Sequence, residues 1–196
     1  MQRILVHRSV HEEFIRRFTE LARELPVGDP SNERTQVGPM IRASDVERVT
    51  TWIAAAKRSG AHELLGPQAG EPLSQTPSVL RPSALTNTRP EMQVNAEEIF
   101  APVCTVEAFS ELDDAIATIN ASRYGLQTGI FTHDLRVAMR TYEELQVGGV
   151  VLNDVPTFRI DHMPYGGVKD SGLGREGVRY AMEETTEPRI LVVRAL

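Results

Sequence analysis

Three short apolar runs alternate with two helical patterns in residues 102–153, which read PVCTVEAFSELDDAIATINASRYGLQTGIFTHDLRVAMRTYEELQVGGVVLN. The apolar runs are typical of strands, and the segments between them repeat apolar residues at helical spacing. Strands that alternate with helices favour parallel pairing through right-handed crossovers. The sequence therefore predicts an α/β fold whose core is a βαβαβ, mostly parallel sheet with flanking helices. The predicted strands are 102–109, 127–132 and 149–153, and the predicted helices are 110–120 and 133–145.

Two further helices are predicted upstream of this core. Ser9 and Ser44 each precede a helical apolar pattern and each have a glutamate three residues later, which is a capping-box spacing. The first helix is expected over 9–25, and the second is expected to end at Gly60. Residues 66–95 carry several prolines and glycines with little periodicity, which predicts a long surface excursion with one strand near 78–80.

The C-terminal end continues with a glycine-rich segment, a short helix and a β-branched run at Arg189–Val193. This run predicts a terminal strand that has no later partner in the chain. We therefore expect one compact α/β domain over 1–185 and a C-terminal strand over 186–196.

Composition excludes several classes of protein. The 196 residues are 41% hydrophobic, enough for a sizeable core, and 21 basic residues are mixed with 27 acidic ones. No run of like charge favours nucleic acid or a membrane surface, and the apolar start is too short for a signal peptide. The one cysteine, Cys104, allows no intrachain disulfide, so we expect a cytoplasmic protein.

Two motifs have a functional and a structural interpretation. Gly172, Gly174 and Gly177 match the G-x-G-x-x-G pattern of dinucleotide sites, but no predicted strand leads directly into them, so a turn before a helix is favoured. Cys104 lies in an apolar run without a neighbouring histidine, so we expect a buried structural thiol and not a nucleophile. The histidines offer no convincing metal site.

Several separated motifs resemble the aldehyde dehydrogenase superfamily. Residues 97–103, EEIFAPV, are similar to its E-E-I-F-G-P-V motif, and 164–172, PYGGVKDSG, to its P-F-G-G-x-K-x-S-G segment. Matches at 27–30, 37–39, 124–126 and 151–153 follow in the family's order. Ala101 and Tyr165 depart from the usual glycine and phenylalanine.

The resemblance implies oxidation of an aldehyde to a carboxylic acid with NAD or NADP, through a covalent cysteine intermediate. Carried over by motif, Glu98 takes the carboxylate that binds the nicotinamide ribose, and Phe100 the aromatic ring near the nicotinamide. Tyr165 takes the aromatic side chain of the substrate pocket. Arg159, in the loop between Asn153 and Tyr165, is a candidate for binding an anionic substrate tail; a solvated surface arginine is the alternative.

The resemblance also places the catalytic cysteine, the general base and the Rossmann half upstream of Met1. No catalytic residue is therefore assigned within the chain, and we expect the isolated chain to be inactive and to bind no cofactor. In the family the terminal strand belongs to an oligomerisation arm, so a homo-oligomer is expected. A free-standing module that pairs with full-length relatives is the alternative, and neither the aldehyde nor the choice between NAD and NADP follows from the sequence.

Overall fold

The structure, a computed structural model, describes residues 1–66, 74–76 and 78–195. The chain forms two compact units, Met1–Ala115 and Ile116–Leu196, and each is described by itself. The boundary falls within helix α4 (Leu112–Asn120).

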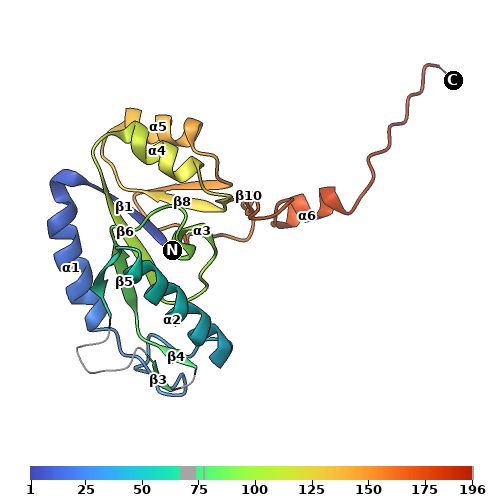
Figure 1. Cartoon of the computed structure of the whole chain (residues 1–196). Helices are drawn as coiled ribbons and strands as arrows, with labels where there is room; N and C mark the ends of the chain where they lie inside the picture. Colours follow the sequence, from blue (N-terminus) through green and yellow to red (C-terminus); the bar gives the residue numbers. More distant parts are fainter. Residues whose placement is uncertain (67–73, 77, 196) are drawn as a thin grey trace. The chain divides into compact units, whose positions relative to one another are not determined.

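The first unit is built on a four-stranded sheet with the order β1-β6-β5-β2 (Figure 1). Strand β6 runs parallel to both of its neighbours, and β2 pairs with β5 in the antiparallel sense. A short hairpin lies outside this sheet. The strands are β1 (Arg3–His7), β2 (His62–Leu65), β5 (Ser83–Thr86) and β6 (Val103–Phe109), with β3 (Ser74–Thr76) and β4 (Val79–Leu80) in the hairpin.

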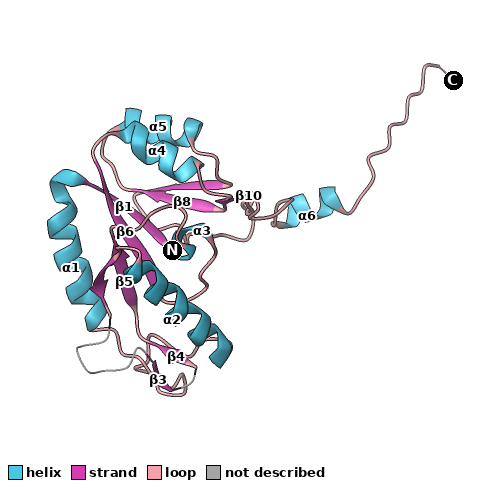
Figure 2. Cartoon of the chain, in the orientation of Figure 1, coloured by secondary structure: helices cyan, strands magenta, loops and turns pink. Residues whose placement is uncertain are grey.

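Helices α1 (His11–Arg23) and α2 (Ala43–Arg58) lie on opposite faces of this sheet (Figure 2). Adjacent strand residues point to opposite faces. Leu85 therefore joins the cluster built on α2, whereas its neighbour Ala84 joins the cluster that packs against α1. Both of these side chains are fully buried, so the sheet is covered on both faces at β5.

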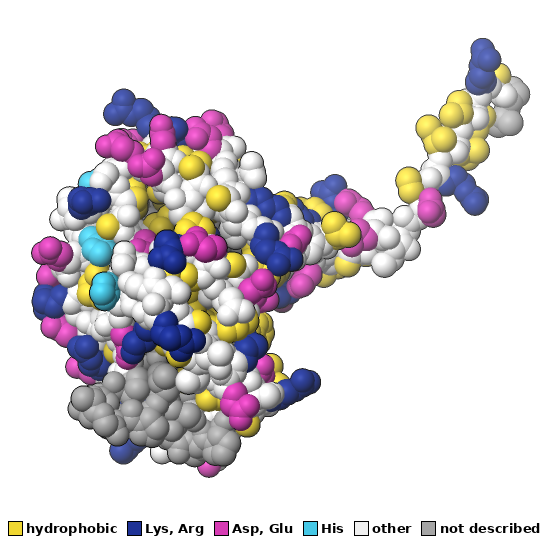
Figure 3. Space-filling view, in the orientation of Figure 1, with side chains coloured by type: hydrophobic (Ala, Val, Ile, Leu, Met, Phe, Trp, Pro, Cys, Tyr) yellow, Lys and Arg dark blue, Asp and Glu magenta, His cyan; other side chains and the backbone are white. Residues whose placement is uncertain are grey.

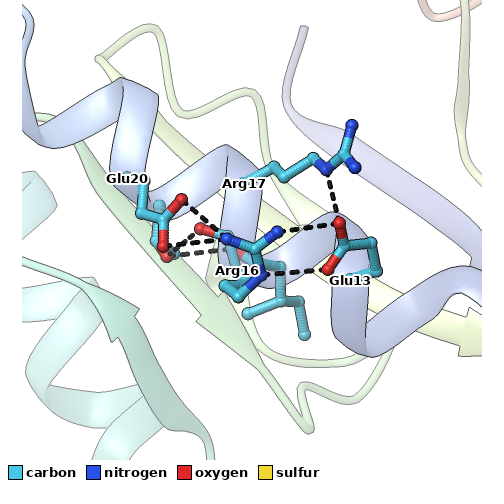
Figure 4. A network of polar contacts seen from close by, with 6 residues as sticks. Glu13, Arg16, Arg17 and Glu20 are labelled. Carbon is cyan, nitrogen blue, oxygen red and sulfur yellow. Dashed lines mark hydrogen bonds and ion pairs between the residues drawn. The ribbon is translucent and has the colours of Figure 1, made fainter.

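The outer face of α1 carries a network of ion pairs. Arg16 contacts Glu13 and Glu20 at 2.8 Å and 3.0 Å, and Glu13 also binds Arg17 (Figure 4). Hydrogen bonds from Arg16 and Arg17 lower the pKa of Glu13 to about 2. Exposed pairs of this kind stabilise a helix only slightly, so the packing of the partly buried Phe14 and Phe18 against the core contributes more to the position of α1.

The second unit contains two parallel strands, β8 (Gln127–Ile130) and β9 (Gly149–Leu152), joined through helix α5 (Leu135–Glu144). Strand β7 (Tyr124–Gly125) pairs with β10 (Val168–Lys169) in the antiparallel sense. Helix α6 (Val178–Glu184) follows, and residues 185–195 form neither helix nor strand. No helix in the described ranges has both the length and the apolar character that a membrane span requires.

The α/β class, with mostly parallel strands and flanking helices, is confirmed. The order of elements over 102–153 is also as predicted, although hydrogen bonds place β6 in one sheet and the β8–β9 pair in another. Gly60 ends α2 as expected: its φ is 101°, and the Gly60 and Ala61 amides donate to the carbonyls of Lys57 and Ala56.

Three local predictions are wrong. Neither Ser9 nor Ser44 caps a helix through its side chain. Instead Ser9 lies in a 3₁₀ turn, Arg8–Val10, where its hydroxyl is 2.7 Å from the His7 ring. The strand expected near 78–80 is confirmed as β4, but residues 78–86 are not a surface excursion, because Leu80, Ala84 and Leu85 are buried core residues. The run Arg189–Val193 has no strand partner among the described residues of the chain, so the terminal strand, which was expected to pair outside the chain, stays a prediction.

Candidate active site

Glu98 and Phe100 lie in the segment that connects helix α3 (Gln93–Ala96) to β6. Both side chains are exposed, Phe100 at 68%, while Ile99 between them is only 2% exposed. The Glu98 carboxylate has no hydrogen bond or ion pair to the part of the chain that the structure describes. The segment therefore offers a free acidic group and an aromatic ring to a ligand.

The backbone at Phe100 has φ of +48°, a left-handed conformation that a side chain with a β-carbon disfavours. Such strain persists only where the surrounding structure holds it, and it occurs often at binding sites. Ala101, which follows, packs against the core cluster of α2. An exposed aromatic residue in a strained conformation is thus presented from a well-anchored backbone.

A network of polar side chains holds α3 and the turn that precedes it. Asn95 donates to the Thr88 hydroxyl at 2.8 Å and to the Arg89 carbonyl at 3.0 Å, and it accepts from the Thr105 hydroxyl at 2.8 Å. Glu107 in turn accepts from the Thr88 amide and hydroxyl, both at 2.7 Å. Because buried polar groups require partners, this network specifies one conformation for the turn that leads into α3.

Arg159 and Tyr165 are in contact in the second unit. The Arg159 guanidinium lies 4.8 Å from the centre of the Tyr165 ring, and its Nη2 is 2.6 Å from a carboxylate oxygen of Glu176. The backbones of Tyr165 and Glu176 also exchange two hydrogen bonds, at 3.2 Å and 2.6 Å. The structure therefore brings two of the predicted site residues together and adds Glu176, which sequence reasoning missed.

In the cluster of Arg159, Tyr165 and Glu176, the Arg159 guanidinium has N–H groups that are not used by the ion pair. Arg159 is half exposed, and one ion pair uses only part of its five N–H groups. The contact with the Tyr165 ring helps to hold the guanidinium in place, and the N–H groups that Glu176 does not bind can donate to an incoming anion. Glu98 and Phe100 belong to the first unit and the Arg159 cluster to the second.

Cys104 lies inside the first unit, among the side chains that pack against α1. Burial raises the pKa of its thiol to about 11. A thiol with that pKa is almost entirely protonated at neutral pH and is a poor nucleophile. The expectation of a buried structural cysteine is confirmed.

The glycine-rich segment forms turns. Gly172, Gly174 and Gly177 all have positive φ, and Gly177 immediately precedes α6. A β-carbon on Gly177 would lie 2.8 Å from the Met163 carbonyl oxygen, so both its conformation and its packing require glycine. The nearest preceding strand, β10, has two residues in an antiparallel pair, so the parallel strand of a dinucleotide fold is not present there.

The aldehyde dehydrogenase family model matches residues 1–191. The 3-sulfolactaldehyde dehydrogenase of Priestia megaterium is 43% identical over 194 residues, which cover 98% of this chain and 39% of that protein. Aldehyde dehydrogenase 21 of Physcomitrella patens, in complex with its reaction product succinate, superposes with a TM-score of 0.93 at 39% identity and covers 99% of this chain and 39% of its own.

Glyceraldehyde-3-phosphate dehydrogenase of Methanocaldococcus jannaschii, in complex with NADP, superposes with a TM-score of 0.85 at 40% identity. That match covers 93% of this chain and 38% of the solved chain. The chain thus spans about two fifths of the length of these relatives. The extent of the family match and the agreement in structure show that this chain belongs to the aldehyde dehydrogenase family.

Proposed function

We propose that this chain is part of an enzyme that oxidises an aldehyde to a carboxylic acid with NAD or NADP. The observation that carries the proposal is the family match over residues 1–191. In this proposal residues 1–185 form part of the catalytic domain, residues 186–196 an oligomerisation strand, and the enzyme is cytoplasmic. The reaction consumes one water and releases one proton with the reduced cofactor.

Glu98 and Phe100 hold the nicotinamide half of the cofactor in this proposal. The exposed Glu98 carboxylate accepts hydrogen bonds from the ribose hydroxyls, and the exposed Phe100 ring supplies an apolar surface beside the nicotinamide. Both side chains are accessible, so the residues present fit this group. When bound, the cofactor accepts the hydride that the aldehyde carbon loses.

Tyr165 and Arg159 serve the substrate in this proposal. Tyr165 lines the pocket, and Arg159 binds an anionic tail through the guanidinium edge that Glu176 does not occupy. Support comes from the names of the relatives. They refer to 3-sulfolactaldehyde, to succinate and to glyceraldehyde-3-phosphate, which carry sulfonate, carboxylate and phosphate groups.

A hybrid enzyme tests the proposed activity. The 194 matching residues of the Priestia megaterium 3-sulfolactaldehyde dehydrogenase are replaced by this chain. We expect the hybrid to reduce NAD or NADP with 3-sulfolactaldehyde. A hybrid that melts cooperatively and binds the cofactor but gives no reduced nicotinamide would contradict the proposal.

Substitution of Arg159 tests the anionic subsite. In the hybrid enzyme we expect Arg159→Ala to raise KM for 3-sulfolactaldehyde by about tenfold or more, because a charge-assisted contact is lost. KM for lactaldehyde, which lacks the sulfonate, should stay unchanged. Arg136→Ala is the matched control, because Arg136 is 94% exposed on α5. Equal increases in KM for both aldehydes would contradict the proposal that Arg159 binds the anionic tail.

The C-terminal segment carries the proposed assembly surface. Ile190, Leu191, Val192 and Val193 are 63–86% exposed, and Figure 3 shows apolar side chains uncovered along this segment. Exposed β-branched runs favour pairing with another chain. We therefore expect a homodimer or larger oligomer of the 196-residue chain, and a smaller species after deletion of residues 186–196. Light scattering measures both masses, and a monomer in both would rule out this role.

A further inference from the structure

Ile99 separates the two proposed cofactor residues, and its own backbone is bound on both sides. Its side chain is 2% exposed, whereas Glu98 and Phe100 point to solvent. The Ile99 amide donates to Gln2, and the Ile99 carbonyl accepts from Arg48. Two side chains from distant parts of the first unit therefore hold the peptide groups on either side of Ile99.

Gln2 uses both ends of its amide on this segment. Its Oε1 accepts from the Ile99 amide at 2.9 Å, and its Nε2 donates to the carbonyls of Val94 and Glu97 at 3.0 Å and 2.7 Å. Two carbonyls and one N–H around the group determine the orientation of the amide. The contacts join the end of α3 to the residues beyond it.

Gln2 is itself fixed to the sheet. It immediately precedes β1, and its carbonyl accepts from the Thr105 amide on β6 at 2.8 Å. The Thr105 hydroxyl also donates to the side chain of Asn95 in α3. The backbone of Gln2 is therefore held at the start of β1 against β6.

Arg48 holds the segment from helix α2. Its Nη2 donates to the Ile99 carbonyl at 3.1 Å, and its guanidinium lies 4.7 Å from the centre of the Trp52 ring and 3.4 Å from Asp45. The contacts with Trp52 and Asp45 limit the positions that the guanidinium can take. With Ile99 bound at both its amide and its carbonyl, Phe100 can be held at a φ of +48°.

We propose that Gln2 and Arg48 are positioning residues for the cofactor-binding segment: they clamp the backbone of Ile99 so that Glu98 and Phe100 are presented together. The proposal rests on the proposed function, because it assumes that Glu98 and Phe100 contact the cofactor. Gln2 and Arg48 act through the backbone and need not touch the cofactor.

Hydrogen exchange in the 196-residue chain tests the clamp without any cofactor. We expect Gln2→Ala to speed exchange of the Ile99 amide by about five- to tenfold, because its acceptor is lost. Gln2→Met should do the same, since methionine fills the space but accepts no comparable hydrogen bond. Gln93→Ala is the matched control, because Gln93 is exposed on the same segment. Protection that survives in Gln2→Met would show that Gln2 only fills space and would overturn the proposal.

Cofactor binding to the hybrid enzyme tests the consequence. We expect Gln2→Met and Arg48→Met to raise Kd for the cofactor about fivefold and to leave KM for the aldehyde unchanged. If Glu98→Gln raises Kd for the cofactor but Gln2→Met and Arg48→Met leave it unchanged, the positioning role is overturned and the proposed function is not. Unchanged Kd in Glu98→Gln itself would instead contradict the proposed function, and the exchange result on the chain would stand separately.

Discussion

The isolated 196-residue chain is expected to give no reduced nicotinamide with any aldehyde. The reaction proposed for the complete enzyme needs a thiolate to attack the aldehyde carbon. Cys104 is the one cysteine of the chain, and burial raises the pKa of its thiol to about 11. At pH 8 only about one thiol in a thousand would be ionised, and it would remain enclosed by the core.

The measurement is the absorbance of reduced nicotinamide with a panel of neutral and anionic aldehydes, with the hybrid enzyme as positive control. The same burial predicts that an alkylating reagent modifies Cys104 slowly at pH 8. The rate should rise only as the pH approaches the raised pKa, because a raised pKa keeps the thiol protonated to higher pH. Turnover by the isolated chain that Cys104→Ala abolishes would contradict both the account of the activity and the structural role of this cysteine.

The parts of the fold that were predicted well from the sequence show a clear periodicity of apolar residues within each element. The segment from β6 to β9 alternates apolar runs with helical spacing, and each of its elements except the two-residue β7 shows its own periodicity over four residues or more. Strand β5 was missed for the opposite reason. It has four residues directly after a proline and is buried on both faces, so it shows no alternation of polar and apolar side chains.

The candidate site was predicted mainly from family motifs. Glu98, Phe100 and Tyr165 lie in family motifs, and Arg159 was chosen by its place in a loop. Gln2 binds residues 92 to 97 positions away, and nothing near Met1 indicates such a contact. Glu176 was visible only as part of a glycine-rich segment, and its pairing with Arg159 depends on how that segment folds back.

The C-terminal segment shows that residue types alone do not predict whether a strand forms. The run after Pro188 has strand-forming residues, yet strand formation also requires a partner for the backbone. No described segment of this chain pairs with it. The residue types therefore predicted the propensity of this segment to form a strand, whereas its conformation depends on whether another strand pairs with it.

A large effect is also expected for Glu98→Gln in the hybrid enzyme. An exposed carboxylate that accepts two ribose hydroxyls makes charge-assisted hydrogen bonds, and an amide offers one oxygen and no charge. We expect hydride transfer to slow by about tenfold or more, or the cofactor to bind more weakly by a similar factor. Glu111→Gln is the control, because Glu111 is an exposed glutamate of the same unit outside the proposed site.

The transient formation of reduced nicotinamide in a single turnover tests the central claim most directly, because it isolates hydride transfer from product release. We expect a clear transient in the hybrid enzyme and in Glu111→Gln, and a slower or smaller one in Glu98→Gln at the same cofactor concentration. Equal transients and equal cofactor affinities in all three proteins would contradict the claim that this segment holds the nicotinamide through Glu98.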